Sequence, residues 1–123
     1  MKNTRTTIWL TLFLSALYPV VALAHAFPER SLPRVGSTVT HTPHTVKIWF
    51  DAGLEALFCR LTVKNAAGQK MNPGRGHVVP GSHDRLLETH VPPLPAGKYH
   101  VYWSVIAVDG HHTQGRYMFK VRG

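Results

Sequence analysis

Cysteine is almost absent from this sequence, since Cys59 is the single one among 123 residues. One cysteine excludes an intramolecular disulfide, so a hydrophobic core must hold the fold. Cys59 alternates with polar neighbours and shares a face with Leu61 and Val63, which predicts a small buried side chain rather than a nucleophile or a thiolate ligand. The G-x-S-x-G and H-E-x-x-H patterns are missing as well, so the hydrolase classes that use them are disfavoured.

A hydrophobic run long enough to span a membrane is also missing. The run Ile8–Val21 is shorter than the roughly 20 apolar residues that a membrane-spanning helix needs. Basic residues precede it and the small-residue sequence Ala22-Leu23-Ala24 follows it, which is the order of a secretory signal peptide. We therefore predict export, removal of residues 1–24, no stable membrane insertion afterwards, and a mature chain that begins with His25. A cut after Ala26 would satisfy a second small-x-small pattern, but Ala22 and Ala24 follow the hydrophobic run directly.

Acidic residues are few: 6 Asp and Glu stand against 14 Lys and Arg, for a formal net charge of +8. Two of these positive charges leave with the predicted signal peptide. The remaining cations are scattered singly along the chain rather than clustered, and export argues against a nucleic-acid partner. This pattern favours a solvated basic surface.

No sustained helical period follows the signal peptide; the recurring pattern is instead an alternation of apolar and polar residues with a period of two. Residues 25–123 have the size of one domain with one core. The alternation, the absence of crossover helices and this size predict an all-β, antiparallel, immunoglobulin-like Greek-key β-sandwich. Trp103 is expected in its core, and Trp49 on the opposite face of its strand from the core residues. Strands are predicted at 45–51, 58–64, 85–91, 98–108 and 115–122, with loops at 69–84 and 92–97.

Histidine is abundant, with nine in the chain, and neutral imidazole is a common metal ligand. Asp109-Gly110 is a strong hairpin signal, so Asp109 has a purely structural explanation. On an extended segment, however, Asp109 and His111 would project from the same face. If the N-terminal strand lies beside this loop, the free amine and imidazole of His25 complete a set of three nitrogens and one oxygen. Such a set suits Cu(II) best, with zinc and nickel as alternatives.

The sequence resembles the CopC family of periplasmic copper-resistance proteins over essentially the whole mature chain. The resemblance rests on His25 at the signal junction, on residues 94–103, and on Trp103 followed shortly by Asp109-x-His111. It implies a Greek-key sandwich in the periplasm that binds one Cu(II) ion through His25, Asp109 and His111.

The sequence also departs from some relatives. Ala52 stands where some of them have an assisting Glu, and neither Asp51 nor Glu55 is predicted as a replacement ligand. Met71 and Met118 are too few for the methionine-rich Cu(I) site of other relatives. His77 and His83, in the same loop as Met71, are candidates only for a weak auxiliary site.

The predicted function is therefore a non-enzymatic periplasmic Cu(II) carrier or buffer for copper resistance and homeostasis. The resemblance implies a CopD-like inner-membrane protein as its partner. One alternative is an oxidative enzyme, because an N-terminal histidine with a second histidine also forms the brace of copper monooxygenases. Another is an adhesion or interaction module whose histidines have no metal-binding role.

Overall fold

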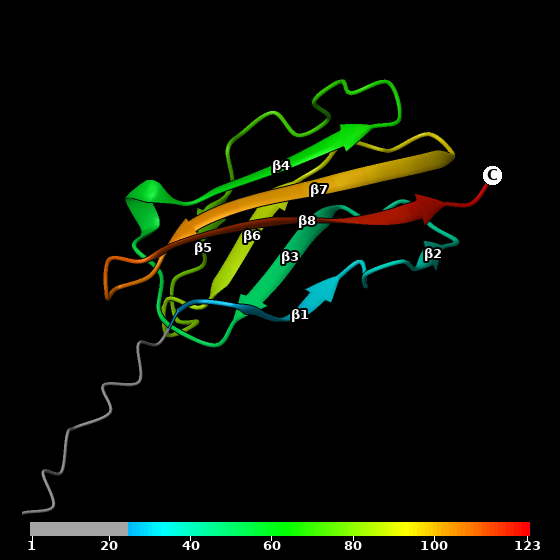
Figure 1. Cartoon of the computed structure of the whole chain (residues 1–123). Helices are drawn as coiled ribbons and strands as arrows, with labels where there is room; N and C mark the ends of the chain where they lie inside the picture. The colour runs from blue at the N-terminus through cyan, green and yellow to red at the C-terminus, as the bar shows by residue number, and fades with distance from the viewer. Residues whose placement is uncertain (1–24) are drawn as a thin grey trace, which may run out of the picture.

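The computed structural model describes residues 25–123, so the predicted signal peptide and its cleavage site lie outside the described residues. Two four-stranded sheets pack face to face (Figure 1). One, called here the β3 sheet, has the order β1-β3-β6-β5, and the other, the β7 sheet, has the order β2-β8-β7-β4. Every pairing is antiparallel except that of β2 with β8.

The chain crosses repeatedly between the sheets, as a Greek-key sandwich requires. The β3 sheet consists of β1 (Pro28–Leu32), β3 (Thr45–Phe50), β6 (Leu86–His90) and the short β5 (His77–Val78). The β7 sheet consists of the short β2 (Thr38–Val39), β8 (His112–Val121), β7 (Gly97–Ile106) and β4 (Arg60–Asn65). A single 3-10 turn, η1 (Ala56–Phe58), precedes β4 in the described part of the chain. The predicted all-β sandwich is confirmed.

The core lies between the sheets and is built from the alternating residues. β3 buries every second side chain, and β4 does so at Leu61 and Val63, as the period of two predicts. β7 follows the same pattern apart from the partly buried Trp103, whereas β8 buries only Phe119 and Val121. Cys59 is fully buried and its Sγ lies 3.2 Å from the carbonyl oxygen of Glu55, which confirms that it is a core residue. Burial also raises the pKa of its thiol, so the thiolate form is disfavoured. The largest fully buried side chains are Phe50, Phe119, Ile48, Leu61, Leu87, Val46, Val63, Val101 and Val105.

The two tryptophans of the sandwich occupy different environments. Trp103 is partly buried and packs edge-on against Phe50, with ring centroids 5.4 Å apart. Its indole lies over Gly115, where an added Cβ would come within 2.5 Å of the ring. Trp49 lies on the other side of the β3 sheet, under the guanidinium of Arg30 at 3.9 Å.

Several strand boundaries differ from the predictions. Strands β1 and β2 were not predicted, and the predicted loop 69–84 contains β5. β2 and β5 are only two residues long, too short to show a period, and β1 buries a single side chain. The strand predicted from residue 58 begins at Arg60, because η1 occupies residues 56–58. The predicted 98–108 strand ends at Ile106, and the last strand begins at His112 instead of 115.

A buried amide ties the loop after β4 to both sheets. The side-chain Nδ2 of Asn72 donates to the carbonyl of Leu61 in β4 and to the hydroxyl of Thr89 in β6. Its Oδ1 accepts from the backbone N–H of Val63. Within the described residues, none of the helical segments has the length and apolar character of a membrane span.

Candidate metal centre

The segment before β1 places His25 at one end of the sandwich. Ala26 is fully buried, and its carbonyl accepts a hydrogen bond of 2.7 Å from the hydroxyl of Thr113 at the start of β8. Phe27 and Asp51 bond reciprocally: the N–H of Phe27 donates to Asp51 Oδ1 at 2.7 Å, and the N–H of Asp51 donates to the carbonyl of Phe27 at 2.9 Å. These three bonds hold the backbone of Ala26 and Phe27, the two residues that follow His25. The His25 side chain lies beside the β7–β8 hairpin, against the ring of His111.

The hairpin between β7 and β8 supplies the other two side chains. Its last strand pair is Ile106 with His112, and Ala107 donates to the carbonyl of His111 at 2.9 Å. Gly110 takes φ +88°, a left-handed conformation that glycine adopts without a Cβ clash. Its N–H donates to the carbonyl of Ala107 at 2.8 Å and closes the turn. The hairpin explanation of Asp109-Gly110 is therefore correct as far as the backbone is concerned.

The same turn brings Asp109 and His111 together. The expectation that they share a face of an extended segment is wrong, because residues 107–111 form a turn rather than a strand. Asp109 Oδ1 accepts a 3.0 Å hydrogen bond from the backbone N–H of His111, and this local bond directs the carboxylate back toward the ring. Asp109 Oδ2 then lies 3.1 Å from Nδ1 of His111.

His25, Asp109 and His111 form one cluster, with a candidate ligand atom from each lying within 4.8 Å of the other two. The rings of His25 and His111 are nearly perpendicular, with centroids 4.5 Å apart. Among residues 25–123, this is the one group of three or more His, Cys, Asp or Glu side chains with such spacing. Figure 1 shows the hairpin and the start of β1 at the same end of the sandwich.

The cluster has an unsatisfied polar atom at its centre. Nδ1 of His111 is buried and has no hydrogen-bond partner. Asp109 Oδ2 lies 3.1 Å from this nitrogen, but not in a hydrogen-bonding direction. A buried nitrogen without a partner is costly unless something else occupies its lone pair. A metal ion bound by the three side chains would satisfy it.

The electrostatics of the cluster favour a cation. The backbone N–H of His111 bonds to the Asp109 carboxylate and, together with the two imidazoles nearby, lowers the pKa of that carboxyl. Asp109 is therefore anionic at neutral pH. Two imidazole nitrogens and one carboxylate oxygen, without thiolate or thioether, are donors that suit Cu(II), Zn²⁺ or Ni²⁺.

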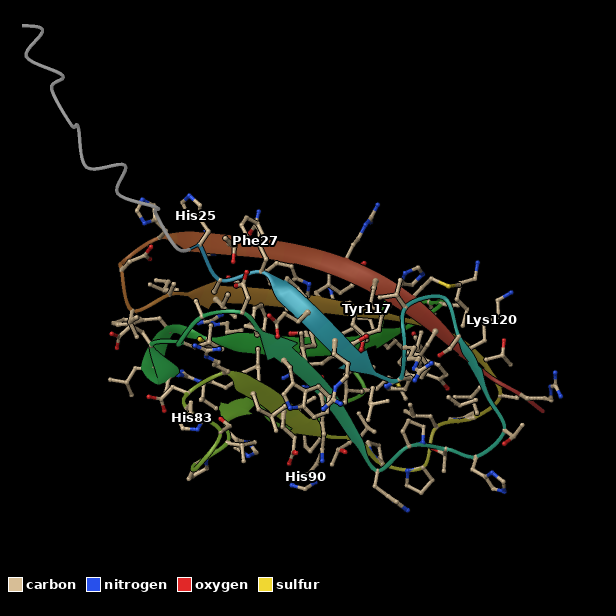
Figure 2. All side chains as sticks on the ribbon, turned by 90° about the horizontal axis from the view of Figure 1, so that it is seen from below. His25, Phe27, His83, His90, Tyr117 and Lys120 are labelled. Carbon is tan, nitrogen blue, oxygen red and sulfur yellow. The ribbon has the colours of Figure 1, made fainter. Side chains whose placement is uncertain are left out.

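The remaining histidines lie apart from this cluster. His112 points away from His111, and its Nε2 lies 2.7 Å from the hydroxyl of Ser104. His83 and His90 lie away from His25 (Figure 2). Met71 packs against the hydrophobic core, and His77 faces Glu88. Among residues 25–123, neither His77 nor His83 belongs to a group of three or more His, Cys, Asp or Glu side chains with metal-binding spacing.

The sequence did not indicate the two residues that hold the backbone next to His25. Thr113 and Asp51 hold the backbone next to His25 without joining the cluster. The carboxylate of Asp51, which is not predicted as a ligand, accepts the N–H of Phe27. No spacing rule predicts such bonds, because each joins segments far apart in the chain.

A Greek-key sandwich with a histidine–carboxylate cluster at one end is a candidate metal-binding domain. The sequence profile of the family described as "CopC domain" matches residues 29–122, and the chain belongs to this family. The curated relative Copper resistance protein C of Escherichia coli is 31% identical over 108 residues, which cover 82% of this chain and 84% of that protein. Copper transport protein CutJ of Bacillus subtilis is 29% identical over 98% of this chain, but the match spans only 22% of CutJ.

Solved structures agree with this assignment. The crystal structure of CopC from Methylosinus trichosporium OB3b matches with a TM-score of 0.70 and 27% identity, over 80% of this chain and 94% of that one. The structure of PcoC, described as a methionine-rich copper resistance protein from Escherichia coli, matches with a TM-score of 0.67 and 28% identity, over 80% of this chain and 100% of that one. The family profile, the curated relatives and the solved structures thus all place the chain in the CopC family.

Proposed function

We propose that the protein is exported to the periplasm, is cut after Ala24, and there binds one Cu(II) ion through His25, Asp109 and His111. The observation that carries this proposal is the convergence of the three side chains, whose candidate ligand atoms lie within 4.8 Å of one another. The bound ion is cargo, which the protein sequesters or carries.

Cleavage after Ala24 completes the ligand set. It frees the α-amine of His25, and a chain that starts with histidine offers this amine and its imidazole to one ion. With His111 and Asp109, the set becomes three nitrogens and one oxygen, which suits the tetragonal geometry of Cu(II). Export and proteolysis would thus create a ligand that the precursor lacks.

The position of the cluster suits transfer rather than permanent storage. The side chains of Asp109 and His111 are 26% and 40% exposed, so an incoming ligand can reach the ion from solvent. We propose that copper passes by ligand exchange to a CopD-like inner-membrane protein. The anionic Asp109 occupies a fourth position at the metal, which leaves less room for oxygen chemistry and supports a non-enzymatic role.

Intact mass spectrometry of the exported protein, with and without Cu(II), tests the proposal. We expect a chain that starts at His25 and gains one copper ion. A chain that starts at Phe27, or one that gains no copper, would contradict it. Hydrogen peroxide and oxidised sugars, formed with ascorbate, would instead favour the copper monooxygenase alternative.

A further inference from the structure

The outward face of the β7 sheet gathers cations that are scattered in the sequence. In β4, β7 and β8, the residues that alternate with the buried ones point away from the core. The registers align these outward positions across the sheet; Lys98 stands opposite Lys120, and Tyr102 opposite Arg116. The cations at these positions, called here the basic face, are Arg60, Lys64, Lys98, Arg116 and Lys120.

No carboxylate balances this face from within its own sheet. None of the six acidic residues of the chain lies in β2, β4, β7 or β8. Among residues 25–123, the ion pairs are Lys47–Glu88, His77–Glu88 and His111–Asp109, and none includes a cation of the basic face. Lys64 lies instead over the ring of Tyr102, at 5.2 Å. The face therefore presents unpaired positive charge.

A hollow in the basic face has the chemistry of a phosphate site. Its volume is about 440 Å³, and Arg60 and Arg116 line it together with the hydroxyl-bearing residues Thr62 and Tyr102. Ser104, whose hydroxyl is paired with His112, completes the lining with Trp103, Gln114 and Gly115. Guanidinium groups bind phosphate oxygens through paired hydrogen bonds, and hydroxyls add further donors. A phosphate group that enters this hollow would meet two positive charges and no carboxylate.

Exposed apolar side chains precede β4, the strand that carries Arg60 and Lys64 of the basic face. Leu57 and Phe58 belong to η1, directly before Arg60 of β4, and are 78% and 60% exposed. Apolar groups next to a basic surface are typical of proteins that rest on a membrane, where the cations meet headgroups and the apolar groups enter the interface. A purely acidic protein surface would leave these apolar groups without a partner.

We propose that the basic face docks on an anionic phospholipid membrane, with a headgroup phosphate in the hollow between Arg60 and Arg116. Outward positions along a strand lie about 7 Å apart and the ten residues of β7 span about 33 Å, so the face can contact several headgroups at once. The inference rests on the proposed export, which brings the protein to a membrane surface, but not on the copper ligands.

The test is sedimentation of the exported, processed protein with vesicles of equal parts phosphatidylglycerol and phosphatidylcholine. We expect binding that weakens with added salt, and none to vesicles of phosphatidylcholine alone. The double variant R60Q/R116Q should lower partition about 30-fold, since each basic residue near an anionic surface contributes roughly fivefold. The matched control is R34Q/R85Q, which removes the same charge at exposed positions outside the basic face; it should change partition less than about twofold.

Three outcomes would overturn the inference: equal binding to both kinds of vesicle, equal losses in the two double variants, or binding to polyglutamate in place of vesicles. The last would assign the face to an acidic protein partner. The variant His111→Ala keeps the basic face intact, so it should still bind vesicles. Loss of copper binding and loss of vesicle binding are thereby distinguished.

Discussion

Histidines lie near a carboxylate at both the end of the sandwich and the outer side of the β3 sheet, and among residues 25–123 only the first group converges. At the end of the sandwich, the rings of His25 and His111 are perpendicular and 4.5 Å apart, with Asp109 beside them. On the outer side of the β3 sheet, His77 and His90 lie near Glu88, but their rings are stacked at 29° with centroids 6.4 Å apart.

The spacing of the ligand atoms and the nearby charge separate the two groups. Among residues 25–123, only His25, Asp109 and His111 bring one ligand atom each to within 4.8 Å of the other two. Lys47 lies 3.5 Å from the Glu88 carboxylate and already neutralises it, which disfavours a second cation. Within residues 25–123, no Lys or Arg is paired with Asp109. A turn and an anchored segment can aim side chains at one point, and a regular sheet spaces them apart.

The largest effect on Cu(II) affinity is expected from removing a ligand of the cluster formed by His25, Asp109 and His111. His111→Ala should lower Cu(II) affinity by more than the roughly 10–100-fold typical of outer-shell changes, because it removes a donor atom itself. Competition with a chelator of known affinity measures it. The matched control His90→Ala removes a histidine from the stacked group and should leave the affinity unchanged. Equal losses in the two variants would remove the distinction between the groups.

The next effect concerns the amine of His25. One residue added ahead of His25 in the processed protein moves the α-amine away and leaves the imidazole in place. We expect Cu(II) affinity to fall by about 100-fold or more, because the amine is itself a proposed donor and the loss of an outer-shell partner alone costs roughly 10–100-fold. Titration monitored by the copper d–d absorption should also show a shifted band. An unchanged spectrum and affinity would mean that the amine is not a ligand.

The affinity should also depend on pH. The α-amine, with an ordinary pKa of about 7.7–8.0, must lose its proton to bind, so affinity should fall by up to about tenfold per unit as the pH drops below this range. The pKa of Asp109 lies below its usual value, so the carboxylate stays ionised near neutrality and adds no dependence there. The chain with a residue ahead of His25 should lose the amine's part of this dependence. A flat affinity from neutral to mildly acid pH would contradict the proposed ligand set.

The smallest effect is expected at the positioning residues. Thr113→Val removes the hydroxyl that holds the carbonyl of Ala26, while nearly conserving the shape of the side chain. We expect a loss of Cu(II) affinity of about tenfold, at the lower end for outer-shell partners, with the copper spectrum unchanged. Thr62→Val, in the outward face of β4, is the matched control and should have no effect. A changed spectrum would show that Thr113 alters the ligand set rather than the position of His25.

Much of the fold could be predicted from the alternation of apolar and polar residues. Val46, Ile48 and Phe50 of β3 are buried as that pattern predicted, because alternation decides which side of a strand faces the core. The two-residue strands β2 and β5 could not be predicted, since they form only through pairing with β8 and β6. Asp109 and His111 lie close together, as predicted, but a turn brings them together rather than an extended segment with both side chains on one face.

The sequence by itself determined the buried face of each long strand, the core position of Cys59, and the residue types available to a metal ion. It did so because these properties depend on neighbours a few positions apart. Only the tertiary structure decided that His25 meets the hairpin, through contacts such as that of Ala26 with Thr113, 87 positions away. It also decided that singly placed cations share one face without a carboxylate, because strand register, and not sequence proximity, sets which side chains become neighbours.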